Sequence, residues 1–336
     1  MAGHKTFHLG EFPLTGGGVL RDGQLAYQTY GTLAPDKRNI VVMPTFYTGS
    51  HDRNEGFFGA GRALDPARHF IVSINLLGGG ISSSPSNSPH QKGPLFPAIS
   101  FQDNIRAQHM LMTHEFGATE IALVLGWSMA GCQAYHWAVQ HPDMVRAILP
   151  FCASARTSPH NFVFLEGVKA ALCADPVWNK GNYQTQPVDG LRAFGRVYAG
   201  WAFSQAFYRN GLYRKIGYDS VADLLDDWAD DHAANWDAND LLCKLATWQQ
   251  GDVSAGTKFN GDFGAALGSI RARTILMPCL QDLYFPPADN EAEAKLIPGA
   301  EFRPVDSDFG HCAANPGNDL RFQNALDANI AELLRP

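Results

Sequence analysis

Ser128, Asp282 and His311 have the residue types that nucleophilic acyl chemistry requires. Ser128 lies within Gly126-Trp-Ser-Met-Ala-Gly131, directly after the apolar stretch Ile121-Ala-Leu-Val-Leu. A serine hydroxyl attacks a carbonyl only when a base removes its proton, and an acid must hold that base in one tautomer. The pattern G-x-S-x-[GA] between a buried strand and a helix is typical of a nucleophile elbow, a tight turn that exposes the serine Oγ. The sequence therefore predicts Ser128 as a catalytic nucleophile.

The acid and the base are predicted from their position after Ser128. Asp282 comes shortly after the apolar segment 274–280, and His311 lies in a glycine-containing loop before the last predicted helix. Where a nucleophile elbow is present, the acid follows the serine and the histidine comes last. Asp306 and Asp308 are rival acids, but they precede His311 by only five and three residues. We therefore predict His311 as the general base and Asp282 as the acid that orients it.

An oxyanion hole is predicted from two backbone N–H groups. The buried strand 39–44 leads into Thr45-Phe-Tyr-Thr-Gly49, and the loop after this strand normally supplies one donor, while the residue after the nucleophile supplies the other. The predicted donors are therefore the N–H groups of Tyr47 and Met129. His51 follows in the same loop and is interpreted as a structural or exposed residue.

The elements that must position these residues alternate between strands and helices. After an N-terminal antiparallel hairpin, apolar runs predict buried strands at 39–44, 70–75, 121–125, 146–151, 274–280 and 301–305, separated by segments of helical spacing. Such alternation predicts an α/β fold with a doubly wound, mostly parallel sheet. The glycine runs at 16–18 and 78–80 lack the spacing of nucleotide-binding loops and are interpreted as turns.

The alternation stops between residues 156 and 262. Only helical segments are predicted there, at 160–173, 191–207, 221–232 and 238–250, and the region is rich in tryptophan, tyrosine and phenylalanine. We therefore predict two domains, a core formed by residues 1–155 and 263–336 and a helical lid formed by residues 156–262. Most lid aromatics are expected to pack its own core, and some to form a dry wall over the serine or a dimer contact.

Composition restricts the partners and the compartment. The 26 Lys and Arg residues against 33 Asp and Glu give a net charge of −7, which argues against nucleic acid or an anionic membrane as the main partner. No apolar run approaches the length of a membrane span, and the first residues lack a signal-peptide core.

The six scattered cysteines form no C-x-x-C pair and are expected to be reduced thiols of a cytoplasmic protein. The histidines lack H-E-x-x-H spacing, so neither a metal nor a cofactor is expected.

Several motifs resemble those of the homoserine O-acetyltransferase family, whose members have the α/β-hydrolase fold. The resemblance covers nearly the whole chain. Asn75-Leu-Leu-Gly-Gly79 resembles the family's N-V-L-G-G loop, and Asp175-Pro-Val-Trp178 with Gly181-Asn-Tyr183 resembles its D-P-x-W-x-x-G-x-Y segment. Further matches are Ile105-Arg-Ala-Gln108, Asp237-Ala-Asn-Asp-Leu241 with Gly251-Asp-Val253, Asp282-Leu-Tyr-Phe-Pro-Pro287 and Asp306-Ser-Asp-Phe-Gly-His311. The resemblance implies a Ser128–Asp282–His311 triad, an acyl-enzyme intermediate and a homodimer formed through the helical lid.

Departures from the family pattern concern the substrate pocket. Trp127 and Ala130 replace glycines of the family's elbow, G-G-S-M-G-G. Lys169 replaces an arginine suited to binding an amino-acid carboxylate. A lysine ammonium cannot form the two parallel hydrogen bonds that a guanidinium forms with a carboxylate. Cys312 replaces an aspartate that can meet the substrate ammonium. With Phe46 and Tyr47 beside Trp127, the pocket is expected to favour a small acyl group such as acetyl.

These departures favour a carboxylic ester hydrolase, because losing the amino-acid anchors leaves water to attack the acyl-enzyme. The expected substrates are small, short-chain esters of the acetate type, as in the esterase members of this family. The main alternative is an acetyl-CoA-dependent acetyltransferase acting on homoserine or another hydroxyl acceptor, which Lys169 could still serve. A third interpretation, a non-catalytic binding protein with this fold, requires the three candidate residues to be inert.

Overall fold

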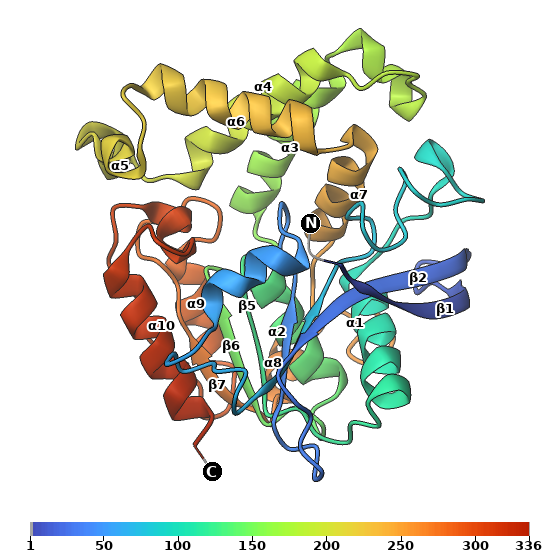
Figure 1. Ribbon diagram of the computed structural model, residues 1–336, viewed down its shortest axis with the longest axis vertical. Helices are drawn as coiled ribbons and strands as arrows, with labels where there is room; N and C mark the ends of the chain where they lie inside the picture. Colours follow the sequence, from blue (N-terminus) through green and yellow to red (C-terminus); the bar gives the residue numbers. More distant parts are fainter. Residues whose placement is uncertain (1–2, 336) are drawn as a thin grey trace.

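An eight-stranded sheet forms the centre of the computed structural model, which describes residues 3–335 (Figure 1). Its order is β1-β2-β4-β3-β5-β6-β7-β8, with β3 to β8 parallel and β1 and β2 antiparallel at one edge. The strands are β1 (Lys5–Pro13), β2 (Val19–Tyr30), β3 (Ile40–Pro44), β4 (Phe70–Ile74), β5 (Leu123–Trp127), β6 (Ala147–Phe151), β7 (Arg273–Leu276) and β8 (Glu301–Phe302). The predicted mostly parallel sheet is confirmed.

The N-terminal hairpin confirms the interpretation of the first glycine run. Strands β1 and β2 pair from Lys5 opposite Tyr27 to Pro13 opposite Val19. The turn between them is closed by a hydrogen bond of 3.1 Å from Leu14 N to Gly18 O, and Gly17 and Gly18 both have positive φ. Glycine adopts this backbone conformation without strain, so these glycines serve the turn.

Helices cover both faces of the sheet, because successive residues of a buried strand point to opposite faces. Val41 and Met43 belong to the core that includes α10 (Leu320–Leu333), whereas Ile40 and Val42 belong to the core on the other face. That second core includes residues of α1 (Phe101–Met110), α2 (Met129–Gln140) and α8 (Phe263–Gly268). The sheet is thus a layer between two apolar cores, as expected for the predicted α/β fold.

Residues 156–262, between β6 and β7, are helical, as predicted, and cover one end of the sheet (Figure 1). Their elements are α3 (Pro159–Cys173), η4 (Pro176–Gly181), α4 (Val188–Ala202), α5 (Gln205–Arg209), η5 (Leu212–Ile216), α6 (Val221–Asn235) and α7 (Ala238–Gln249). The predicted single helix 191–207 is instead two helices. The break comes at Ser204, whose hydroxyl accepts a hydrogen bond from Phe207 N and so begins α5 as a cap.

The remaining elements differ from the predictions mainly at their ends. Helix α1 begins with a Ser100–Asp103 capping box and continues into a π-helical turn, η3 (Leu111–Glu115). Strand β7 ends at Leu276, and the rest of the predicted run continues only as isolated bridges. The other elements are η1 (His51–Phe57), η2 (Gly93–Leu95), α9 (Pro287–Ala294) and η6 (Gly310–Ala314). Among the described helices, none combines the length and the apolar character of a membrane span.

Candidate active site

Ser128 occupies a strained turn between β5 and α2. Its backbone has φ 60° and ψ −129°, a conformation that non-glycine residues rarely adopt and that costs about 1–3 kcal/mol. The turn is tight because a Cβ added to Gly126 would lie 2.3 Å from the Cβ of Ala130, and one added to Gly131 would lie 2.5 Å from that of Ala153. Small residues at these positions therefore allow the strand and helix to meet and present Ser128 at the helix N-terminus.

His311 is held by Asp282 through a buried hydrogen bond. The distance from His311 Nδ1 to Asp282 Oδ2 is 2.7 Å, and both side chains are at most 4% exposed. The other carboxylate oxygen of Asp282 accepts hydrogen bonds from Tyr284 N at 2.8 Å and Phe285 N at 3.0 Å. With Nδ1 facing the carboxylate, the imidazole is oriented so that Nε2 is free to act as a base.

Aromatic rings pack around the imidazole of His311. Trp127 stacks on it with ring centroids 5.2 Å apart, and Tyr284 and Phe285 lie at 4.6 and 5.6 Å. Ser128 and His311 line the same pocket, although within residues 3–335 no hydrogen bond joins them. Such hydrogen bonds are often long without substrate and tighten when it binds. The geometry brings together the three residues predicted as a triad.

The two predicted oxyanion donors belong to two segments, the start of α2 and the loop after β3. Met129 is the first residue of α2, so its N–H has no intrahelical partner. No described residue accepts a hydrogen bond from Tyr47 N–H, which lies in the loop after β3. The phenol of Tyr47 points away into the lid, where it donates to Leu241 O at 2.8 Å. The N–H groups of Met129 and Tyr47 are therefore both available to donate a hydrogen bond to a substrate oxygen.

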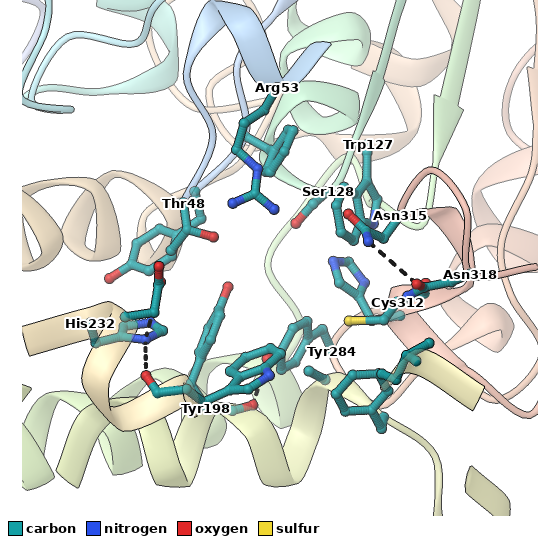
Figure 2. Close-up of a pocket in the computed structure, with 18 of the residues that line it drawn as sticks. Thr48, Arg53, Trp127, Ser128, Tyr198, His232, Tyr284, Cys312, Asn315 and Asn318 are labelled. Carbon is teal, nitrogen blue, oxygen red and sulfur yellow. Dashed lines mark hydrogen bonds and ion pairs between the residues drawn. The ribbon is translucent and has the colours of Figure 1, made fainter. Parts of the chain in front are cut away.

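A pocket of about 350 Å³ opens above Ser128, between the sheet and the helical lid (Figure 2). Of the predicted pocket residues, Phe46, Trp127 and Cys312 line it. Phe46 and Trp127 pack with ring centroids 4.8 Å apart, so they form one apolar wall beside the serine. Burial raises the pKa of Cys312, which keeps the thiol neutral, so position 312 supplies no negative charge to the pocket.

The expectation that Lys169 lines the pocket is wrong. Lys169 lies on the exposed side of α3, where its ammonium is 3.1 Å from Glu166 Oε1. Phe164 and Val168 of the same helix point into the lid core. Helical periodicity separates these faces, and the family motif alone did not indicate which face the lysine occupies.

The pocket also contains polar residues that the sequence analysis did not single out. Arg53 extends from η1, and Figure 2 shows its guanidinium directed into the space that Ser128, Tyr198 and Cys312 surround. Residues that complete the lining are Thr48, Ala202, Phe203, Ile216, Tyr218, Asp227, Trp228, Asp231, His232, Tyr284, Asn315 and Asn318. The lid aromatics among them bear out the expectation of an aromatic wall over the serine. Arg53 carried no motif, and only the folding of the loop after β3 brings it to the site.

Cys152 is a further unpredicted neighbour of the triad. Its Sγ, a carboxylate oxygen of Asp282 and a ring nitrogen of His311 lie within 4.8 Å of one another. Zinc binding by cysteine requires a thiolate, whereas burial, followed by the charge of Asp282, raises the pKa of the Cys152 thiol. Asp282 and His311 are already hydrogen-bonded to each other. The three residues therefore fit an acid–base pair with a neutral thiol beside it better than they fit a metal site.

Comparisons with known proteins now identify the family. The model of the alpha/beta hydrolase fold matches residues 39–314. The chain belongs to the α/β-hydrolase fold family. It is 37% identical over 334 residues to the ethyl acetate hydrolase of Pseudomonas veronii, covering 98% of this chain and 95% of the relative. It is 33% identical to the homoserine O-acetyltransferase of Trichormus variabilis, with 90% and 87% covered.

The solved structures agree with this grouping. The structure of the acetyl esterase MekB superposes with a TM-score of 0.96 at 36% identity, covering 99% of this chain and 97% of that one. Both esterases and homoserine O-acetyltransferases are therefore relatives of this chain, which confirms the resemblance predicted from its motifs.

Proposed function

We propose that this chain is a serine carboxylesterase that hydrolyses short-chain, acetate-type esters. The observation that carries the proposal is the buried His311–Asp282 pair in a pocket with Ser128 at its base. The nearly full-length similarity to an ethyl acetate hydrolase and to an acetyl esterase supports the same activity. The reaction needs no cofactor and no metal, because serine, histidine and aspartate suffice for acyl transfer.

The proposed reaction proceeds through an acyl-enzyme. His311 takes the Ser128 proton as Oγ attacks the ester carbonyl, and the N–H groups of Tyr47 and Met129 stabilise the oxyanion, each by about 3–4 kcal/mol in comparable sites. His311 then protonates the leaving alcohol, whose departure leaves the acyl group on Oγ. A water molecule, deprotonated by His311, attacks this acyl ester and releases the acid and Ser128.

The test of this assignment is hydrolysis of ethyl acetate and p-nitrophenyl acetate by the purified chain and its Ser128→Ala variant. We expect the variant to lose at least about a thousandfold in kcat, since nothing else in the pocket replaces the nucleophile. A variant that keeps most of the activity would refute the triad. Labelling by a fluorophosphonate separates an inert binding protein from an enzyme, because only an activated Ser128 reacts.

An acetyl-CoA-dependent acetyltransferase is the second candidate function, because charged side chains line the pocket at positions outside the family motif. Arg53 on one wall and Asp227 and Asp231 of α6 could face a charged hydroxyl acceptor. Asp227 already accepts a hydrogen bond from Tyr218 at 2.6 Å, and position 312 is neutral, which favours water as the acceptor. Supplying acetyl-CoA with homoserine decides between them: release of free CoA that depends on homoserine, with negligible ester hydrolysis, would overturn the esterase.

We further propose a homodimer through the helical lid and a cytoplasmic location. Apolar side chains are exposed on the lid, namely Phe162 and Val163 on α3 and Val188 and Val197 on α4. A second copy that covers them would remove exposed apolar side chains from water. All six cysteines are free thiols, as expected of a chain kept in a reducing compartment. The division into a core and a lid at residues 156 and 262 also remains our proposal.

A further inference from the structure

Lys244 is a buried cation in the helical lid that no step of the proposed reaction uses. It lies on α7 with only 1% of its surface exposed. Among residues 3–335 it forms no ion pair. Asp240, the carboxylate that acts on it electrostatically, uses both of its oxygens to accept hydrogen bonds from Ser86. A buried ammonium without a paired carboxylate is rare, since desolvation strongly disfavours the charge. The charged form of Lys244 therefore needs a specific contact that compensates for the loss of hydration.

That contact is the predicted oxyanion loop. The ammonium of Lys244 donates a hydrogen bond to the main-chain oxygen of Tyr47. The phenol of Tyr47 in turn donates to Leu241 O, three residues before Lys244 on the same helix, at 2.8 Å. Helix α7 thus holds the main chain and the side chain of one loop residue. Two aromatic rings also pack against the ammonium. The distance from Lys244 Nζ to the ring centroid is 4.4 Å for Trp236 and 5.3 Å for Tyr47.

We propose that Lys244 is a positioning residue for the oxyanion hole, fixing Tyr47 in the orientation that points its N–H at the substrate and placing a positive charge beside it. The inference rests on the proposed function, in which the Tyr47 N–H receives the oxyanion. A hydrogen bond to the carbonyl of a residue restricts the rotation of its backbone. A positive charge in a dry site stabilises negative charge that develops nearby more than it stabilises the neutral ester.

The charge of Lys244 changes within an accessible pH range. Burial lowers the pKa of Lys244 to about 8, against a smaller opposing effect of the Asp240 carboxylate. The ammonium is therefore present at pH 7 and lost as the pH rises through 8. The neutral amine can still donate to Tyr47 O, so raising the pH removes the charge while the hydrogen bond can persist.

Among residues 3–335, the other titratable groups that face Lys244 keep their charge between pH 7 and 10. These groups are Asp240 and Cys243 on α7, His232 on α6 and the Tyr47 phenol. Burial raises the pKa of Asp240 to about 6 and that of Cys243 to about 12. Burial also raises the pKa of Tyr47 and lowers that of His232. A fall in kcat near pH 8 would therefore report Lys244.

The experiment compares Lys244→Met with Lys215→Met, a matched change at an exposed lysine of η5 in the same lid. Methionine keeps the length and apolar stem of the side chain but neither donates nor carries charge. Ethyl acetate hydrolysis is followed by pH-stat from pH 7 to 9.5, with thermal unfolding as the check of folding. We expect kcat of Lys244→Met to fall about tenfold or more at pH 7 with KM changed less than about twofold, because the lost interaction acts on the transition state.

The pH profile separates positioning from a merely structural role. The unmodified chain and Lys215→Met should lose kcat as the pH rises through about 8, whereas Lys244→Met should show no such fall. A Lys244→Met enzyme with the kcat and alkaline fall of Lys215→Met overturns the inference. Should Lys244→Met not fold, a flat profile of the unmodified chain between pH 7 and 9.5 overturns it instead. Ser128→Ala run in parallel keeps the two proposals apart, because substantial activity there refutes the triad itself.

Discussion

At the residue scale, we propose that the side chain of Trp127 limits the size of the acyl group. It is the last residue of β5, is 7% exposed, and packs against both Phe46 and the imidazole of His311. The family motif that the elbow resembles, G-G-S-M-G-G, has a glycine at this position. The indole therefore fills space beside Ser128 that a longer acyl chain would need.

Replacing Trp127 with alanine should shift the preference towards longer acyl chains. Two additional methylenes that enter the vacated space contribute about 1.6 kcal/mol, so the ratio of kcat/KM for p-nitrophenyl butyrate over acetate should rise about tenfold. Trp178→Ala, the same change at a lid tryptophan outside the pocket, should leave the ratio unchanged. An unaltered ratio in Trp127→Ala would show that another wall limits the acyl group.

Helices α4 and α6 are the elements that set the far wall of the pocket. They cross where Gly195 lies, and a Cβ at this position would come within 2.4 Å of Trp228 O on α6. Tyr198 and Trp228, which line the pocket, lie on these helices close to the crossing. The absence of a side chain at Gly195 therefore fixes the distance between two helices and, through it, the shape of the pocket.

Gly195→Ala should force α4 and α6 apart. The backbone contact cannot relax by rotating a side chain, so we expect a loss of about 1–3 kcal/mol in the free energy of unfolding, together with a higher KM for ethyl acetate. Gly200→Ala is the matched control on the same helix, where an added Cβ meets nothing within 4 Å. That change should be neutral or stabilising by up to about 1 kcal/mol in urea unfolding. Equal stability of the two variants would contradict the close-crossing argument.

At the scale of the whole molecule, the exposed apolar side chains of α3 and α4 lead to a prediction about assembly. Val163 is 65% exposed on α3, beside Phe162 at 45%. We expect the chain to sediment as a dimer at micromolar concentration and Val163→Glu to sediment as a monomer, because a dry interface strongly disfavours an unpaired carboxylate. Leu320→Glu, at an equally exposed apolar residue of α10 far along the chain from the lid, should remain dimeric. A monomeric unmodified chain would refute the proposed assembly.

The sequence alone determined the order and type of nearly every element of the core. Local rules were sufficient there: apolar runs predicted the strands, and the small residues around Ser128 predicted the turn between β5 and α2. The positions of Asp282 and His311 after Ser128 predicted the pair that the fold joins by a hydrogen bond. The ends of elements were less predictable. Strand β7 stops at Leu276 and the lid helix breaks at Ser204, since strand pairing and capping depend on neighbours distant in sequence.

Only the tertiary structure decided which residues face the pocket. Lys169 resembled a substrate residue by its place in a motif, yet it lies on the outer side of α3. Arg53 and Lys244 had no signature, but one reaches the pocket from η1 and the other contacts Tyr47 from a helix almost two hundred residues further along the chain. Motifs record chemistry that depends on local backbone geometry. Contacts between the lid and the core depend on how two distant segments pack, and no local pattern encodes that packing.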